Sequence, residues 1–143
     1  KSEIAGYFGK YFASDPMKTD GVLMREYIHA MSGLDVTFSG WTVGVQYILR
    51  YIPEYTSLLD VPQTENMLTF KAVRTWLRET VKLEVFSYIG LDQPDALVRT
   101  KIAWDVFDGF RLTAGVNLFL GETGYFGQYD KNDMLYTEAR MSF

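Results

Sequence analysis

The chain has 143 residues, of which 48% are hydrophobic and 16% aromatic, and its formal net charge is −4. This composition excludes a disordered chain and a basic nucleic-acid-binding surface, and it indicates a single domain over residues 1–143 or part of a larger one. No cysteine is present and no apolar run is long enough for a transmembrane helix, so disulfides, thiolate metal sites and helical membrane anchors are not expected.

The predicted elements are strands, because apolar and polar residues alternate between turn-forming residues. In chain order we expect eight strands, over residues 4–13, 23–38, 41–52, 67–77, 80–91, 96–107, 110–121 and 134–143. Ser39-Gly40 and Asp108-Gly109 are two-residue hairpin signals, and Arg78-Glu79 is a weaker tight connection. The remaining connections are moderate or long. All the predicted tight turns therefore lie at one end of the sheet.

The last predicted strand alternates strictly and ends on Phe143. A terminal strand of this kind resembles the C-terminal signal of Gram-negative outer-membrane β-barrels. The resemblance implies an all-β, antiparallel up-and-down transmembrane β-barrel of about eight strands, or a part of a larger barrel. It also implies that Tyr136, Met141 and Phe143 belong to a membrane-insertion signal. Short turns at one end and long loops at the other are typical of such barrels.

The period of two sorts the strands into an apolar face, expected to contact lipid, and a polar face, expected to line a lumen. Central members of the apolar face are Val43, Val45, Leu83, Ile102, Leu112 and Val116. The lumen-facing residues predicted to matter most are Arg50, Lys71, Lys82, Glu84, Arg99, Lys101, Asp105, Arg111, Glu138 and Arg140. His29, Asp35, Gln46 and Asn117 share that face.

Aromatic residues near both ends of the predicted strands favour a bilayer, because amphipathic rings concentrate at membrane interfaces. At the turn end these residues are Phe38, Trp41, Trp76, Phe110 and Phe143. At the loop end they are Tyr51, Tyr55, Tyr88, Tyr125, Phe126 and Tyr129. Arg74 falls on the apolar face, which predicts either a side chain that extends to the interface or a β-bulge in its strand.

A narrower resemblance is carried by residues 126–133 together with the terminal strand, and by Ala5-Gly6-Tyr7-Phe8 and Gly33-Leu34-Asp35. These stretches are similar to the C-terminal region of large proteobacterial porin-like barrels of poorly defined function. Some of those barrels are encoded beside lipid-type exporters of the resistance-nodulation-division class. The resemblance implies an outer-membrane location in a Gram-negative bacterium. It further implies contact with outer-membrane lipid and lipopolysaccharide, with the barrel-assembly machinery and with an inner-membrane exporter.

The sequence predicts a channel for small or amphiphilic solutes, and not an enzyme. On the inward face seven basic residues stand against four acidic ones, which favours anionic solutes. His29 is the only histidine and no Gly-rich phosphate loop is present, so no catalytic residue, metal or cofactor is expected. Two alternatives stay open at this point. One is a small closed eight-stranded barrel that acts as a membrane anchor or surface-binding protein, and the other is a soluble lipocalin-like barrel.

Overall fold

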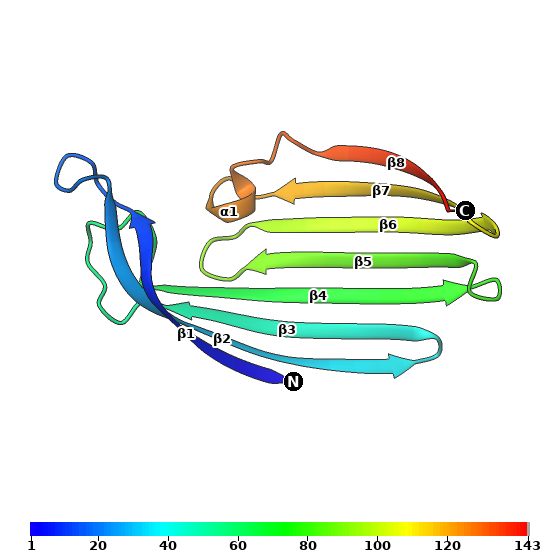
Figure 1. Cartoon of the computed structure of the whole chain (residues 1–143), viewed down its shortest axis with the longest axis horizontal. Coiled ribbons are helices and arrows are strands. Elements are labelled where there is room, and N and C mark those ends of the chain that lie inside the picture. Colours follow the sequence, from blue (N-terminus) through cyan, green and yellow to red (C-terminus); the bar gives the residue numbers. More distant parts are fainter. Residues whose placement is uncertain (143) are drawn as a thin grey trace.

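The computed structural model describes residues 1–142 as one antiparallel sheet whose eight strands follow the order of the sequence (Figure 1). The strands are β1 (Ser2–Ala13), β2 (Val22–Phe38), β3 (Trp41–Tyr51), β4 (Thr64–Trp76), β5 (Val81–Gly90), β6 (Ala96–Phe107), β7 (Phe110–Leu120) and β8 (Met134–Met141). A single helical turn, α1 (Gly124–Gly127), lies between β7 and β8. The predicted all-β, up-and-down architecture is confirmed, and each predicted strand is present with small shifts at its ends.

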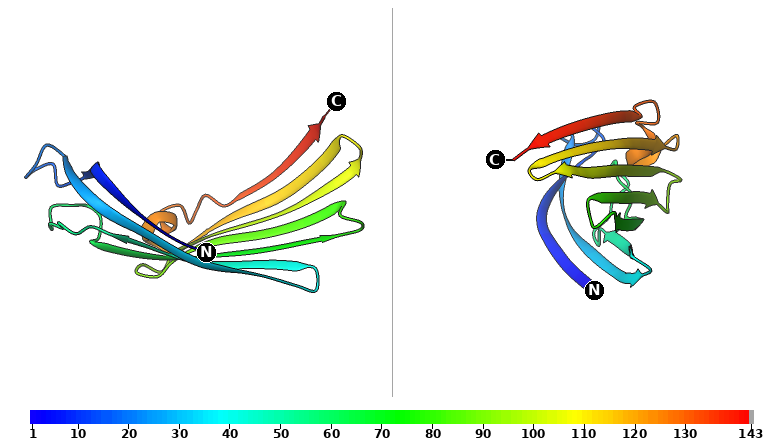
Figure 2. Two further views of the ribbon diagram at one scale, coloured as in Figure 1. Left: turned by 60° about the horizontal axis from the view of Figure 1, so that its bottom comes forward. Right: turned by 90° about the vertical axis from the view of Figure 1, so that its right-hand side faces the viewer.

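The sheet is strongly curved and open (Figure 2). Within residues 1–142, β1 and β8 form its two edges and do not pair with each other, so the chain does not close into a barrel. The helix α1 lies inside the curve. Although α1 follows β7, the Tyr125 hydroxyl reaches the Arg50 guanidinium on β3, which only a curved sheet allows because neighbouring strands are about 4.8 Å apart. The face that carries Arg50 is therefore the concave, inner face.

Tight turns join the strands at one end, as predicted (Figure 1). Ser39 and Gly40 both have positive φ, at 46° and 78°, which is the geometry of a type I′ hairpin turn. At the second turn only Gly109 has positive φ. The connection after β4 is a four-residue turn in which Leu77, Arg78 and Glu79 all have positive φ. Long connections occupy the opposite end of the sheet, which we call the loop end.

Strand register confirms that the apolar side chains share one face. One cross-strand row runs through β2 to β8 and contains Val36, Val43, Ala72, Val85, Thr100, Val116 and Leu135. Several apolar side chains of this face are largely exposed, including Leu34 at 76%, Ile102 at 44% and Leu135 at 81%. The outer, convex face is therefore an extended apolar surface that the chain leaves uncovered.

The buried core is small and lies at the loop end of the inner face. It consists of Phe12, Ile52 and Leu59, against which Leu23, Tyr27 and Val61 pack. The connection between β3 and β4 reaches this core by pairing with the end of β1, where Asp60 donates its backbone N–H to the Ala13 carbonyl at 3.0 Å. The long connections, and not the sheet faces alone, thus supply the core.

Within residues 1–142 the register is interrupted by two β-bulges, and neither lies in β4. In β1 one extra residue falls between Tyr7 and Lys10, where Gly9 has a φ of 69°. In β6 the register shifts between Asp105 and Phe107. The bulge predicted around Arg74 is therefore wrong, because β4 keeps continuous register with both neighbours. Arg74 stays on the apolar face near the turn end, with its guanidinium 5.3 Å from the centre of the Trp41 ring.

Candidate functional site

The inner face of the sheet brings together all ten residues predicted to line a lumen. Register places them on β3 to β8, on the side opposite the apolar rows. They are Arg50, Lys71, Lys82, Glu84, Arg99, Lys101, Asp105, Arg111, Glu138 and Arg140. We call the part of this face nearer the tight turns the turn half; it carries nine of the ten residues, from Lys71 to Arg140. The part nearer the long connections, which carries Arg50, is the loop half.

In the turn half Glu84 and Asp105 form ion pairs, whereas Glu138 and part of the basic set form none within residues 1–142. Glu84 lies 3.5 Å from the Lys82 ammonium and 3.2 Å from the Lys101 ammonium. Arg111 donates to both carboxylate oxygens of Asp105, at 2.5 and 2.8 Å. Within residues 1–142, Lys71, Arg99 and Arg140 make no ion pair. These three are therefore the basic side chains of this half whose charge no ion pair neutralises within the described residues.

The three residues of the predicted insertion signal do not share one location. Tyr136 faces inward, and its ring covers Gly115 of the neighbouring strand so closely that a Cβ at Gly115 would displace the ring. Tyr136 lines a shallow hollow of about 80 Å³ with Phe86 and Arg99. Met141 lies on the outer face opposite Phe110. Phe143 lies outside the described residues.

In the loop half, the connection between β7 and β8 folds back over the inner face. We call residues 121–133 the inward segment. The Asp95 side chain, 6% exposed in the β5–β6 connection, accepts a hydrogen bond from the Phe126 backbone N–H at 2.7 Å. Gly124, with a φ of 89°, packs directly against the Asp95 carboxylate. The Phe126 ring stacks on Tyr88 of β5 with the ring centres 5.6 Å apart. A buried carboxylate and an aromatic pair therefore hold this segment in place.

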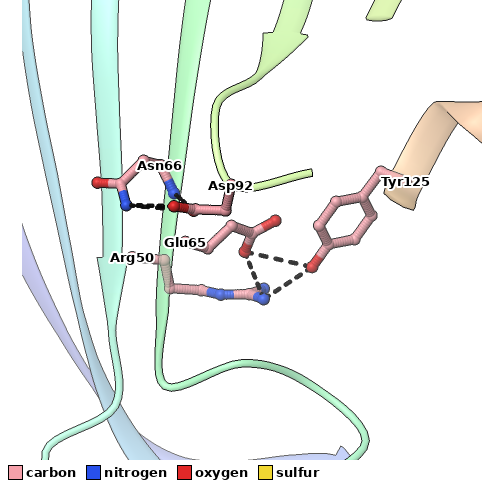
Figure 3. A network of polar contacts seen from close by, with 5 residues as sticks. All are labelled: Arg50, Glu65, Asn66, Asp92 and Tyr125. Carbon is pink, nitrogen blue, oxygen red and sulfur yellow. Dashed lines mark hydrogen bonds and ion pairs between the residues drawn. The ribbon is translucent and has the colours of Figure 1, made fainter. Parts of the chain in front are cut away.

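Arg50, Glu65 and Tyr125 form a polar latch between the sheet and the inward segment (Figure 3). The Arg50 guanidinium contacts the Glu65 carboxylate at 2.5 Å and donates to the Tyr125 hydroxyl at 2.7 Å. The Tyr125 hydroxyl in turn donates to Glu65 at 3.3 Å. Burial raises the pKa of the Tyr125 phenol; Arg50 opposes this increase, and Glu65 adds to it. Burial at the latch therefore favours the neutral form of the Tyr125 phenol.

Two hollows meet at the latch. The hollow on the sheet side, which we call the aromatic hollow, has a volume of about 500 Å³. Its lining comprises Lys10, Tyr27, His29, Ile48, Arg50, Glu65, Met67, Phe119, Tyr125, Phe126 and Tyr129. The second hollow, of about 470 Å³, lies towards the long loops and is lined by the acidic residues Asp60, Glu65, Asp92 and Asp95. Glu65, Met67 and Tyr125 belong to both linings, so the latch separates an acidic hollow from one that contains cations.

The predicted ring of aromatic residues at the loop end is only partly present. Tyr88, Tyr125, Phe126 and Tyr129 point to the inner side, where they line the aromatic hollow or stack on one another. The physical reason is that the inward segment folds over the concave face, so its rings face the sheet, with Tyr125 and Tyr129 still 45% and 46% exposed. At the turn end the register does place Phe38, Trp41, Trp76 and Phe110 on the outer face.

Three important residues of the loop half escaped the sequence analysis. Glu65 lies within β4, two residues before its predicted start, and extending the alternation by two residues would have placed it inward beside Arg50. Lys10 faces inward only because of the bulge in β1, which alternation does not reveal. Asp95 lies in a Pro-Asp turn whose sequence gives no signal for its contact with Phe126.

Among residues 1–142, no helix has the length and apolar character to span a membrane. The same residues contain no group of three or more His, Cys, Asp or Glu side chains placed to hold a metal ion. No protein-family model matches the chain, and no curated protein or solved structure is significantly similar to it.

Proposed function

We propose that the chain forms part of the wall of an outer-membrane β-barrel channel that passes small or amphiphilic, preferentially anionic solutes. The observation that carries the proposal is the contrast between the two faces. The outer face presents a continuous, exposed apolar surface, whereas the inner face carries the charged residues. A large uncovered apolar surface is costly in water and is matched by a lipid environment.

The arrangement of connections and termini supports the same proposal. All tight turns lie at one end and the long connections at the other, which is the asymmetry of outer-membrane barrels. The C-terminal end of β8 also lies at the turn end, where the Ser142 N–H donates to the Gly109 carbonyl at 2.7 Å. In this proposal the turn end is periplasmic. Lipopolysaccharide, the barrel-assembly machinery and an inner-membrane exporter are proposed partners.

The two alternatives find less support in the fold. A lipocalin-like barrel carries its apolar face inside, around the ligand, whereas here the apolar side chains lie on the convex face. A closed eight-stranded anchor requires β1 and β8 to pair, and these strands are separate edges. An open, curved sheet is the shape expected of one section of a wider barrel.

Adjacent residues on opposite faces provide the test of membrane insertion. In a variant with Trp41, Trp76 and Trp104 replaced by Phe, a single tryptophan is introduced by Val45→Trp on the outer face or Gln46→Trp on the inner face. In phosphatidylcholine vesicles, brominated acyl chains should strongly quench the fluorescence of the first tryptophan and barely affect the second, because only the outer face contacts lipid. Equal quenching of the two, or none, would contradict the membrane-wall proposal.

Channel activity is tested in planar bilayers with the intact barrel to which the chain contributes, because the open sheet of residues 1–142 does not enclose a pore by itself. We expect a conductance with anion preference that weakens as salt rises, because a field of this kind is screened over about 8 Å at physiological ionic strength. Lys71 and Arg99 lie on the inner face and have no ion-pair partner among residues 1–142, so Lys71→Glu with Arg99→Glu should shift the reversal potential towards cations. Lys131→Glu, in the exposed loop, is the matched control. Absence of conductance at any salt would refute the channel.

A further inference from the structure

The aromatic hollow combines three properties of a small-molecule site. Its volume of about 500 Å³ lies within the range of ligand pockets, roughly 300 to 1,000 Å³. It is bounded on one side by β1 to β4 and on the other by the inward segment, so a bound molecule would be enclosed between two elements. Its lining is mostly aromatic and aliphatic, with a few polar groups among them.

The polar groups of the hollow leave a positive charge without an acidic partner. Glu65 is the only carboxylate of the lining, and the latch already engages it with Arg50 and Tyr125. The Lys10 ammonium makes no ion pair within residues 1–142 and lies 5.0 Å from the centre of the Tyr27 ring and 5.4 Å from that of Phe12. Arg50 also has a buried Nε without a hydrogen-bond partner. The unmatched charge therefore favours an anionic group beside Lys10.

The apolar part of the lining continues from this charge across the sheet. Ile48 on β3 and Met67 on β4 are directly opposed in the register. Phe119, near the end of β7 from which the inward segment leaves, lines the same hollow. These side chains offer contacts to an alkyl chain and no hydrogen-bonding group. Charge at one end and apolar contacts along the rest are the complement of a single-chain amphiphile.

We propose that the aromatic hollow is a binding site for a single-chain amphiphilic anion, such as a medium-chain alkyl carboxylate. The carboxylate lies beside the Lys10 ammonium, and the alkyl chain lies along Ile48, Met67 and Phe119. This inference rests on the proposed function, since it gives the channel a solute class and a site for it. The hollow is on the inner face, so the occupant reaches it as a solute and not from the lipid that faces the outer surface.

The test is photolabelling of the full chain in phosphatidylcholine vesicles with a decanoate that carries a diazirine on its chain, followed by peptide mapping. Fragmentation of the labelled peptides assigns each label to a residue, and we expect labels on Ile48, Met67 or Phe119. Lys10→Gln should reduce these labels about tenfold, because a charge-assisted contact of about 1.4 kcal/mol corresponds to that factor. Lys10→Arg should retain them, and Lys131→Gln is the matched control for loss of a lysine.

Several outcomes would overturn the binding site. Labels confined to outer-face residues such as Val45 and Leu83 would show that the probe only partitions into the membrane. Inner-face labelling that Lys10→Gln leaves unchanged, or that the corresponding uncharged alcohol probe reproduces, would remove the anionic head from the proposal. If anionic phosphatidylglycerol in the vesicles competes away the label, the occupant is membrane lipid and the proposed solute is wrong. Conductance that persists without inner-face labelling would discard this site alone, and labelling without conductance would discard the channel alone.

Discussion

The turn half and the loop half of the inner face are built on different principles. In the turn half, charged side chains follow the strand alternation and interact with neighbours on the same or the adjacent strand, as Glu84 does with Lys82 and Lys101. In the loop half, contacts join residues far apart in the sequence, and the Arg50 to Tyr125 hydrogen bond spans 75 positions. The comparison teaches that the sheet supplies a repetitive charged surface, while the connections supply the enclosed, specific part.

The difference is sharpest in what a single substitution should do. A side chain in the turn half contacts only its neighbours within the sheet, so its loss should be local. A side chain in the loop half holds the inward segment against the sheet, so its loss should release that segment. The four predictions below test this contrast, from the largest expected effect to the smallest.

Asp95→Ala should have the largest effect, lowering the unfolding free energy by about 3 kcal/mol because a buried carboxylate that holds the Phe126 N–H is lost. Urea unfolding in vesicles measures it, and faster proteolysis within residues 121–133 should accompany it. Asp130→Ala, an exposed carboxylate in the same segment, should stay near the wild type. Equal values for the two variants would mean that Asp95 does not hold the inward segment.

Glu65→Gln should lower the unfolding free energy by about 2 kcal/mol, because it leaves the largely buried Arg50 charge without its carboxylate. The matched substitution in the turn half is Glu138→Gln, which removes no ion pair seen among residues 1–142, and its effect should be close to zero. Urea unfolding again provides the measurement. A larger effect at Glu138 than at Glu65 would reverse the comparison between the two halves.

Gly115→Ala tests the turn half alone. The added Cβ meets the Tyr136 ring, so we expect a loss of about 1 kcal/mol in unfolding free energy. In a Tyr136→Ala background the same change should instead stabilise the sheet by about 0.5 to 1 kcal/mol, since Ala is favoured over Gly in a strand. The double-mutant cycle in urea gives both values. A cost that persists without the ring would show that Gly115 is required for another reason.

Titration of Tyr125 should have the smallest effect on stability. Its raised pKa means that the folded chain favours the protonated phenol. The resulting stabilisation is complete below the ordinary tyrosine pKa near 10 and is lost as pH rises through the raised value. Ultraviolet difference absorbance of the phenolates should therefore show a late-titrating component that Tyr125→Phe removes. Tyr55→Phe, in an exposed loop, is the control, and loss of the same component there would contradict the assignment.

The halves also differ in how far the sequence predicts them. Alternation placed Lys71, Glu84 and Lys101 on the right face because period two is imposed by the backbone and survives any change of neighbours. The loop half depends on tertiary contacts that no local pattern encodes. Tyr125 reads as an interfacial aromatic residue in the sequence, and only the curvature of the sheet brings it to Arg50. Likewise, nothing beside Asp95 in the chain indicates that its partner is Phe126.

The bulge in β1 shifts the inward–outward alternation of side chains by one residue within the strand. Before it Tyr7 stacks on Tyr27, and after it Lys10 and Phe12 return to that same side, although an odd number of positions separates Tyr7 from Lys10. One residue is therefore surplus to the pattern. Deleting Gly9 would leave an ordinary alternating strand with the same side chains inward. Gly9→Val would instead place a β-branched residue in the left-handed region, at a φ of 69°, where it is strained. The deletion of Gly9 should therefore destabilise the fold less than Gly9→Val does.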